Sequence, residues 1–133
     1  MRLDLTSLKL AIASLGRGIA RSKTAPEDEE LRDAVIQRFE YTYDLCWRML
    51  KRRIELDAAV PSAVDAMSFR ELMRDAGERG LVDDVARWFV YREQRNVTSH
   101  IYDSRKAAEV YATALEFLAD AQSLLDRLAE RNP

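Results

Sequence analysis

Residues 81–132 read LVDDVARWFVYREQRNVTSHIYDSRKAAEVYATALEFLADAQSLLDRLAERN and contain neither glycine nor proline. Strands joined by tight turns need both residues at frequent intervals, so this segment favours long helices. The whole chain of 133 residues holds only four glycines and three prolines. Because this length corresponds to one domain by the usual size relation, we predict a single all-α domain over residues 1–133.

Apolar residues recur every three or four positions in five segments, which is the spacing of one helix face. The pattern predicts helices over about 3–21, 25–56, 69–76, 81–95 and 104–130. Residues 57–67 are expected to form the one long linker. Since four of the five helices are long, the expected architecture is an up-and-down four-helix bundle with one additional short helix.

Two capping boxes indicate where helices begin. Thr24 with Glu27 fits the T-x-x-E pattern before the second helix, and Ser68 with Glu71 fits the same pattern before the short one. The last helix is expected to begin at Asp103 or the serine after it. Its apolar face is broader than one packing partner requires, which leaves two interpretations: a wide core face, or a core face beside a dimer face.

Charge and composition exclude several functions. The chain has 21 basic and 23 acidic side chains and a formal net charge of -2, which argues against a protein that coats nucleic acid by bulk charge. The single cysteine, Cys46, excludes an intrachain disulfide, and the single histidine, His100, excludes a multi-histidine metal site. We therefore expect no metal and no other cofactor, and we expect Cys46 to be a reduced core residue.

Neither a secretory signal nor a membrane span is expected. Charged residues interrupt the N-terminus before any apolar run forms, and no segment approaches the roughly 18 apolar residues of a membrane helix. These features predict a cytoplasmic protein with no membrane partner.

The segment from Trp88 to Asp103, WFVYREQRNVTSHIYD, concentrates polar and ionisable side chains between two apolar helices. Arg95 and His100 are five residues apart, which would place them about 140° apart around a continuous helix. They converge only if the chain bends between them, or if two copies meet at a symmetry axis. A purely structural interpretation stands beside this one, because Asn96 and Ser99 are residue types that end one helix and begin the next.

These residue types suit acid–base chemistry on a phosphodiester or a phosphoanhydride. An imidazole titrates near neutral pH and can transfer protons, and a guanidinium binds phosphate oxygens in pairs. One histidine per chain is few for a reaction that needs both a base and an acid, whereas a two-fold dimer supplies two at one cleft. A homodimer is therefore a mechanistic expectation as well as a packing one.

Arg95, His100 and Tyr102 match the R-x4-H-x-Y motif of HepT-like proteins in the HEPN superfamily. Together with the block RDAVIQRFEYTY at residues 32–43 and with Trp47, this motif makes the chain resemble the nucleotidyltransferase substrate-binding protein family over nearly its whole length. The resemblance implies a single HEPN-like helical domain that forms a homodimer and binds a small, separate nucleotidyltransferase.

The resemblance also implies a function. Related HEPN proteins are metal-independent ribonucleases, and in HepT-type toxin–antitoxin pairs the nucleotidyltransferase silences the toxin by attaching AMP to the motif tyrosine. By carry-over, Arg95 would stabilise the phosphate of RNA in the dimer cleft, His100 would transfer protons, and Tyr102 would be the modified residue. The supporting positions are Asn96, Ser99 and Asp103.

Two other hypotheses stay open. In one, the bundle is a non-catalytic subunit whose cleft binds a nucleotide or an acceptor for the nucleotidyltransferase. In the other, it is a structural bundle with a well-capped helix junction. Tyr41, Tyr43 and Trp47 either line a nucleotide pocket or belong to the core, and Glu40, which interrupts this aromatic block, has a polar role that the sequence does not assign.

Overall fold

The computed structural model describes residues 2–132, and this part of the chain forms six α-helices and one 3₁₀ turn without a strand. The all-α prediction is confirmed. The elements in chain order are α1 (Thr6–Lys23), α2 (Glu29–Asp57), α3 (Pro61–Asp65), α4 (Phe69–Glu78), α5 (Val85–Val97), the 3₁₀ turn η1 (Thr98–His100) and α6 (Ser104–Glu130). Within the described residues, no helix is both long and apolar enough to cross a membrane.

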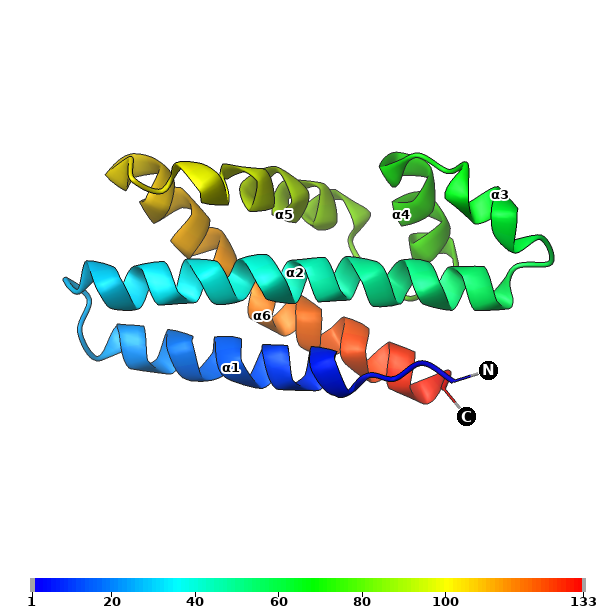
Figure 1. Ribbon diagram of the computed structural model, residues 1–133, viewed down its shortest axis with the longest axis horizontal. Helices are drawn as coiled ribbons and strands as arrows, with labels where there is room; N and C mark the ends of the chain where they lie inside the picture. The colour runs from blue at the N-terminus through cyan, green and yellow to red at the C-terminus, as the bar shows by residue number, and fades with distance from the viewer. Residues whose placement is uncertain (1, 133) are drawn as a thin grey trace.

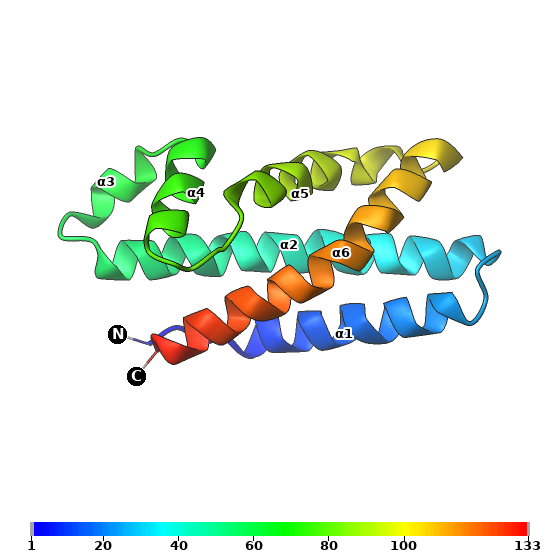
Figure 2. The ribbon, with the colours of Figure 1, turned by 180° about the vertical axis from the view of Figure 1, so that it is seen from behind.

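The four long helices α1, α2, α5 and α6 alternate in direction, as the predicted up-and-down bundle requires (Figure 1). α2 is the central element and packs against the other three. Seen from behind, α6 crosses α2 obliquely (Figure 2). It runs from the end of α5 to the end of the bundle where the N- and C-termini lie side by side. There the backbone N–H of Leu3 donates to Asn132 Oδ1 at 2.7 Å, and Asn132 Nδ2 donates to the Leu3 carbonyl at 2.9 Å.

The region between α2 and α5 differs from the sequence prediction in two respects. The linker after α2 contains the short helix α3, which Pro61 opens at a position where its missing N–H costs no hydrogen bond. The bundle therefore carries two additional short helices instead of one. α5 begins at Val85 instead of Leu81, because Asp84 caps it, while Leu81 and Val82 are buried in the connection before it.

The start of α2 differs from the one predicted from the sequence. The capping box predicted for Thr24 and Glu27 does not form, because Thr24 ends α1 and its hydroxyl donates to a carbonyl of that helix at 2.7 Å. Asp28 is the N-cap instead, and its Oδ1 accepts from two backbone N–H groups of the first turn at 2.9 and 3.1 Å. The other two predicted starts are confirmed, since Ser68 caps α4 and Asp103 caps α6.

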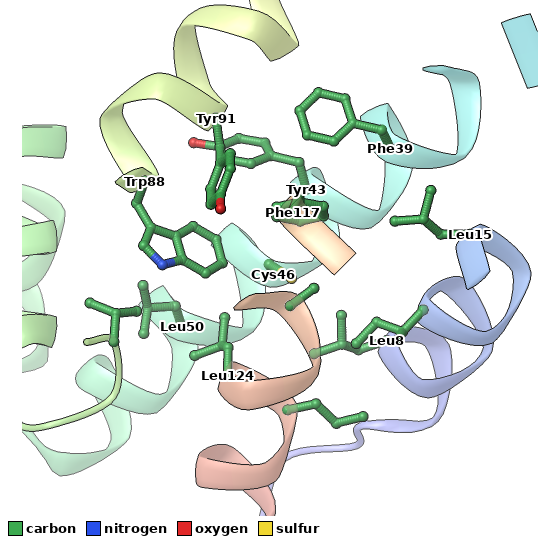
Figure 3. Close-up of a cluster of buried hydrophobic side chains, with 14 of the residues drawn as sticks. Leu8, Leu15, Phe39, Tyr43, Cys46, Leu50, Trp88, Tyr91, Phe117 and Leu124 are labelled. Atoms are coloured by element: carbon green, nitrogen blue, oxygen red, sulfur yellow. The ribbon is translucent and has the colours of Figure 1, made fainter. Parts of the chain in front are cut away.

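A cluster of five aromatic side chains lies where α2, α5 and α6 meet (Figure 3). Phe117 of α6 contacts Phe39 and Tyr43 of α2 and Trp88 and Tyr91 of α5, with ring centroids 5.0 to 6.3 Å apart. Rings of this size bury about 150–250 Å² each and prefer such tilted and edge-on geometry. The cluster therefore fixes the position of α5 on α2, and with it the position of the polar segment that follows.

Most of the broad apolar face of α6 is buried in the core. Its buried residues are Ala107, Val110, Ala114, Phe117, Ala121, Leu124, Leu125 and Leu128. Leu115 and Leu118 beside them are only partly buried and line an open groove between α1 and α6. Cys46 is fully buried under the same layer, and burial raises the pKa of its thiol, as expected of a core cysteine.

Candidate functional site

The last turn of α5 directs Arg95 at α2. The Arg95 guanidinium binds Asp44 through two parallel hydrogen bonds, Nε to Oδ1 at 2.9 Å and Nη2 to Oδ2 at 3.1 Å. Its Nη2 also lies 3.6 Å from Glu40 Oε1. The hydrogen bond with Asp44 raises the pKa of the Arg95 guanidinium, so this half-buried group is charged and held by two carboxylates.

His100 and Tyr102 lie in a far more open environment at the turn between α5 and α6. The 3₁₀ turn η1 begins at Thr98, whose hydroxyl donates to the Arg95 carbonyl at 2.7 Å and so closes the end of α5. His100 ends η1 with an exposed imidazole, and its Nδ1 lies 3.4 Å from the Tyr102 hydroxyl. The Tyr102 side chain is 85% exposed.

The bend at η1 does not join Arg95 and His100 by a hydrogen bond within residues 2–132. Arg95 is bonded to α2 and to Thr98, whereas the His100 imidazole interacts with the ring and hydroxyl of Tyr102, and no hydrogen bond joins the two motif residues among residues 2–132. Of the two ways in which the sequence allowed them to converge, the bend within one chain does not produce a hydrogen bond between them in the described residues, and convergence across a dimer axis stays a prediction.

The three supporting positions have different environments. Asp103 is the N-cap of α6, and its Oδ1 accepts from the backbone N–H groups of Arg105 at 3.0 Å and Lys106 at 3.3 Å, so it has the structural role of a cap. Ser99 is exposed on η1. Asn96 is exposed and lines a small pocket beside Arg95.

Sequence reasoning missed Asp44, although it singled out Glu40 without a role. The signal was present, because two carboxylates four residues apart on one helix repel each other and favour a cation between them. The Arg95 guanidinium is that cation. Of the aromatic residues around them, Tyr43 belongs to the core, Trp47 is partly buried, and Tyr41 donates to or accepts from Ser14 at 2.7 Å on the surface.

The pocket beside Arg95 has a volume of about 180 Å³ and lies between α2, α4 and α5. Its lining combines aromatic, cationic and amide side chains: Tyr43, Asp44, Trp47, Phe69, Arg92, Arg95 and Asn96. No group of three or more His, Cys, Asp or Glu side chains within residues 2–132 is arranged to bind a metal ion.

The fold and the junction define an all-helical bundle protein with an Arg–His–Tyr motif between its last two long helices. Residues 3–130 match the family described as nucleotidyltransferase substrate binding protein like, and the chain belongs to this family. A curated relative, the probable ribonuclease HepT of Haemophilus influenzae, is 41% identical over 97 residues, which are 73% of this chain and 66% of the relative. The match thus leaves about a third of that relative uncovered.

Two solved structures have a similar fold. One, from Haemophilus influenzae, is described as revealing the fold of a substrate binding domain of a nucleotidyltransferase; it has a TM-score of 0.88 and 33% identity, and the match covers 95% of this chain and 99% of that chain. The other is a crystal structure from Thermus thermophilus with a TM-score of 0.72 and 25% identity, covering 91% of this chain and 98% of that chain. The similarity therefore extends over nearly the whole bundle.

Proposed function

We propose that this chain is a HepT-like, metal-independent endoribonuclease toxin that acts as a homodimer and is neutralised by a partner nucleotidyltransferase. The observation that carries the proposal is the exposed His100–Tyr102 pair directly after a charged, carboxylate-held Arg95, in a chain similar to a probable ribonuclease HepT. The whole of residues 1–133 would form one HEPN-like domain.

RNA supplies its own nucleophile for such a reaction. A histidine acting as base takes the proton of a ribose 2′-hydroxyl, the 2′-oxygen forms a bond to phosphorus, and the bond from phosphorus to the 5′-oxygen breaks. The leaving 5′-oxygen takes a proton from an acid, which leaves a 2′,3′-cyclic phosphate and a 5′-hydroxyl. In a two-fold dimer, His100 of one copy is the base and His100 of the second copy is the acid.

Arg95 retains donor capacity for this role. Among residues 2–132, its Nη1 makes only a long hydrogen bond of 3.4 Å to Thr98 Oγ1, whereas its Nε and Nη2 interact with Asp44 and Glu40. A guanidinium fixed on one edge by carboxylates presents its other edge in a defined direction, which suits a phosphate whose charge grows in the transition state.

Tyr102 is the proposed site of AMP attachment. Its hydroxyl is exposed, as a second enzyme acting on it requires, and it lies 3.4 Å from the imidazole of His100. An AMP group on this oxygen adds a negative charge next to His100, which repels RNA phosphates and occupies the space they need.

The test is cleavage of a single-stranded RNA by the purified chain without its partner. We expect wild-type protein to elute as a dimer and to cleave the RNA, and we expect Arg95→Ala and His100→Ala each to lower the rate by roughly 10²- to 10⁴-fold. Cleavage at the wild-type rate by His100→Ala would contradict the assignment of His100 to proton transfer. Arg17→Ala, a change of an exposed arginine on α1, is the control and should cleave at the wild-type rate.

A second function is favoured by one observation. The two carboxylates on Arg95 neutralise its charge in this protomer, which suits a non-catalytic subunit whose pocket holds a nucleotide or an acceptor for the nucleotidyltransferase. The description of the similar Haemophilus influenzae structure as a substrate binding domain agrees with this alternative. It predicts a stable complex with the nucleotidyltransferase and no RNA cleavage by the free dimer.

A further inference from the structure

Three aromatic rings from three helices meet beside the Arg95 pocket. Phe69 of α4 lies between Trp47 of α2 and Phe89 of α5, with ring centroids 4.8 and 5.6 Å away. Two guanidinium groups stack on these rings: Arg92 Cζ lies 4.1 Å from the centroid of Phe69, and Arg70 Cζ lies 4.7 Å from that of Phe89. The result is one cluster of three adjacent rings, in which Phe69 and Phe89 each carry a stacked guanidinium.

The two stacked arginines differ from Arg95 in their charge balance. Arg95 is held by two carboxylates, whereas neither Arg70 nor Arg92 forms an ion pair with a carboxylate in the described part of the chain. Arg92 lines the same pocket as Arg95, and Arg70 does not. The positive charge that is left for an incoming anion at this pocket is therefore that of Arg92.

The pocket is matched to one flat group. Its volume of about 180 Å³ is below the roughly 300–1,000 Å³ of sites that enclose drug-sized ligands. Its lining includes the planar groups of Trp47, Phe69 and Arg92 and the hydrogen-bonding groups of Asp44 and Asn96, and Arg92 lies over the Phe69 ring. Unstacked bases of single-stranded RNA bind to surfaces of this kind, on aromatic rings and arginine planes.

We propose that this pocket binds one nucleobase of single-stranded RNA, with Phe69 and Arg92 as its stacking wall. The proposal rests on the proposed ribonuclease function, since it places a base next to the phosphate that Arg95 would contact. It assigns α4, which lies outside the R-x4-H-x-Y motif, a part in substrate binding. Arg92 stacks on the base and its charge attracts the adjoining phosphate.

A purely structural role makes a different prediction. If the aromatic contacts only fasten α4 to α2 and α5, then changing Phe69 or Arg92 lowers stability and leaves RNA affinity per folded molecule unchanged. The variants should therefore preserve bulk: Phe69→Leu keeps an apolar side chain without a ring, and Arg92→Lys keeps the charge without the plane. Arg70→Gln is the matched control, because it removes an equally unpaired stacked cation outside the pocket.

The experiment measures binding of a labelled single-stranded RNA of about ten nucleotides by fluorescence anisotropy, with His100→Ala in every protein to prevent cleavage. Loss of base stacking weakens affinity by roughly 5- to 150-fold, so we expect this loss for Phe69→Leu and a smaller one for Arg92→Lys. Arg70→Gln removes one positive charge outside the pocket, and we expect it to change the affinity by less than about twofold. Equal affinity in the His100→Ala parent and in the same protein with Phe69→Leu added, both folded by circular dichroism, would overturn the base pocket.

Trp47 gives a second readout that is independent of cleavage. A base stacked in the pocket should quench Trp47 fluorescence, whereas ribose 5-phosphate at the same concentration should not, and Trp47→Phe identifies the signal against that of the buried Trp88. Quenching by AMP and by RNA without any cleavage by wild-type protein supports the pocket and rejects the ribonuclease proposal. Cleavage without quenching, and with an unchanged KM in Phe69→Leu, supports the ribonuclease and rejects the pocket.

Discussion

The two ends of α5 lie in contrasting surroundings. Trp88 and Tyr91 near its start are at most 4% exposed and pack in the aromatic cluster around Phe117. Three residues past its end, His100 is exposed, and its imidazole interacts with Tyr102 at a long distance of 3.4 Å. Buried packing and the exposed residues of the proposed site are therefore separated along this helix and the turn after it, so that a change in one should spare the property that depends on the other.

The strongest way to test this separation is to remove the centre of the aromatic cluster. Phe117→Ala deletes a fully buried ring that touches four others, and such truncations cost about 3–5 kcal/mol of unfolding free energy. Urea unfolding monitored by circular dichroism measures the loss. Per folded molecule, the ribonuclease rate should stay within about twofold of wild type; a much lower rate per folded molecule would show that the two ends are coupled.

High pH should also lower stability, and it should do so through buried groups of the core. Burial raises the pKa of the Cys46 thiol and of the Tyr43 and Tyr91 hydroxyls in the folded state, so these groups keep their protons at pH values where the unfolded chain loses them. The unfolded state then binds fewer protons than the folded one, and the free energy of unfolding falls as pH rises above about 8.5. For the thiol alone the fall is about 2 kcal/mol at about pH 10.

Cys46→Ala isolates the thiol contribution. Its unfolding free energy, measured in urea at about pH 7.5 and about pH 10, should decline by less than that of the wild-type protein. An identical decline in both proteins would mean that the Cys46 thiol does not contribute to the alkaline instability.

Asp44→Ala should have a smaller effect, but on both stability and the rate of RNA cleavage. It removes both short hydrogen bonds to Arg95, and because the pair is more than a third exposed on the Asp44 side, we expect a loss of only about 1 kcal/mol. The rate of RNA cleavage should fall by about tenfold, since Arg95 loses its orientation.

The matched control for this change is Asp33→Ala. Asp33 forms an ion pair with Arg32 at 3.0 Å on the same helix and is similarly exposed, but it has no contact with the motif. It should cost at most about 1 kcal/mol of stability and leave the rate unchanged. A rate loss in Asp33→Ala equal to that in Asp44→Ala would mean that the effect of Asp44 is not specific to Arg95.

Tyr102→Phe should have the smallest effect on the chain without its partner. The side chain is 85% exposed and loses one hydrogen bond of 3.4 Å, so the melting temperature and the cleavage rate should be almost unchanged. With the partner nucleotidyltransferase and ATP, however, intact mass spectrometry should show an added AMP on wild type and none on Tyr102→Phe. An AMP group on the variant would place the modification on another residue.

The sequence predicted the four long helices and the junction because both depend on local patterns. Apolar periodicity and the caps at Ser68 and Asp103 were sufficient for most boundaries. The start of α2 was misplaced because Thr24 fits a capping box in sequence, but the preceding helix uses it first. α3 was missed because its five residues are too few to show periodicity.

The candidate site was predictable as a motif but not as an arrangement. The spacing of Arg95, His100 and Tyr102 is visible in the sequence, whereas the bond from Arg95 to Asp44 joins residues 51 positions apart and depends on how α5 lies on α2. The same is true of the contact of Arg92 with Phe69, because α4 and α5 are brought together by packing and not by any local pattern.

Analysis of the end groups of the RNA products decides whether the chain cleaves RNA through His100 and without a metal ion. Wild-type protein and His100→Ala are incubated with single-stranded RNA in excess EDTA. We predict fragments with a 2′,3′-cyclic phosphate and a 5′-hydroxyl from the wild type, and intact RNA from His100→Ala at an equal melting temperature. Fragments with a 5′-phosphate, or RNA left intact by the wild type, would contradict the proposed ribonuclease function.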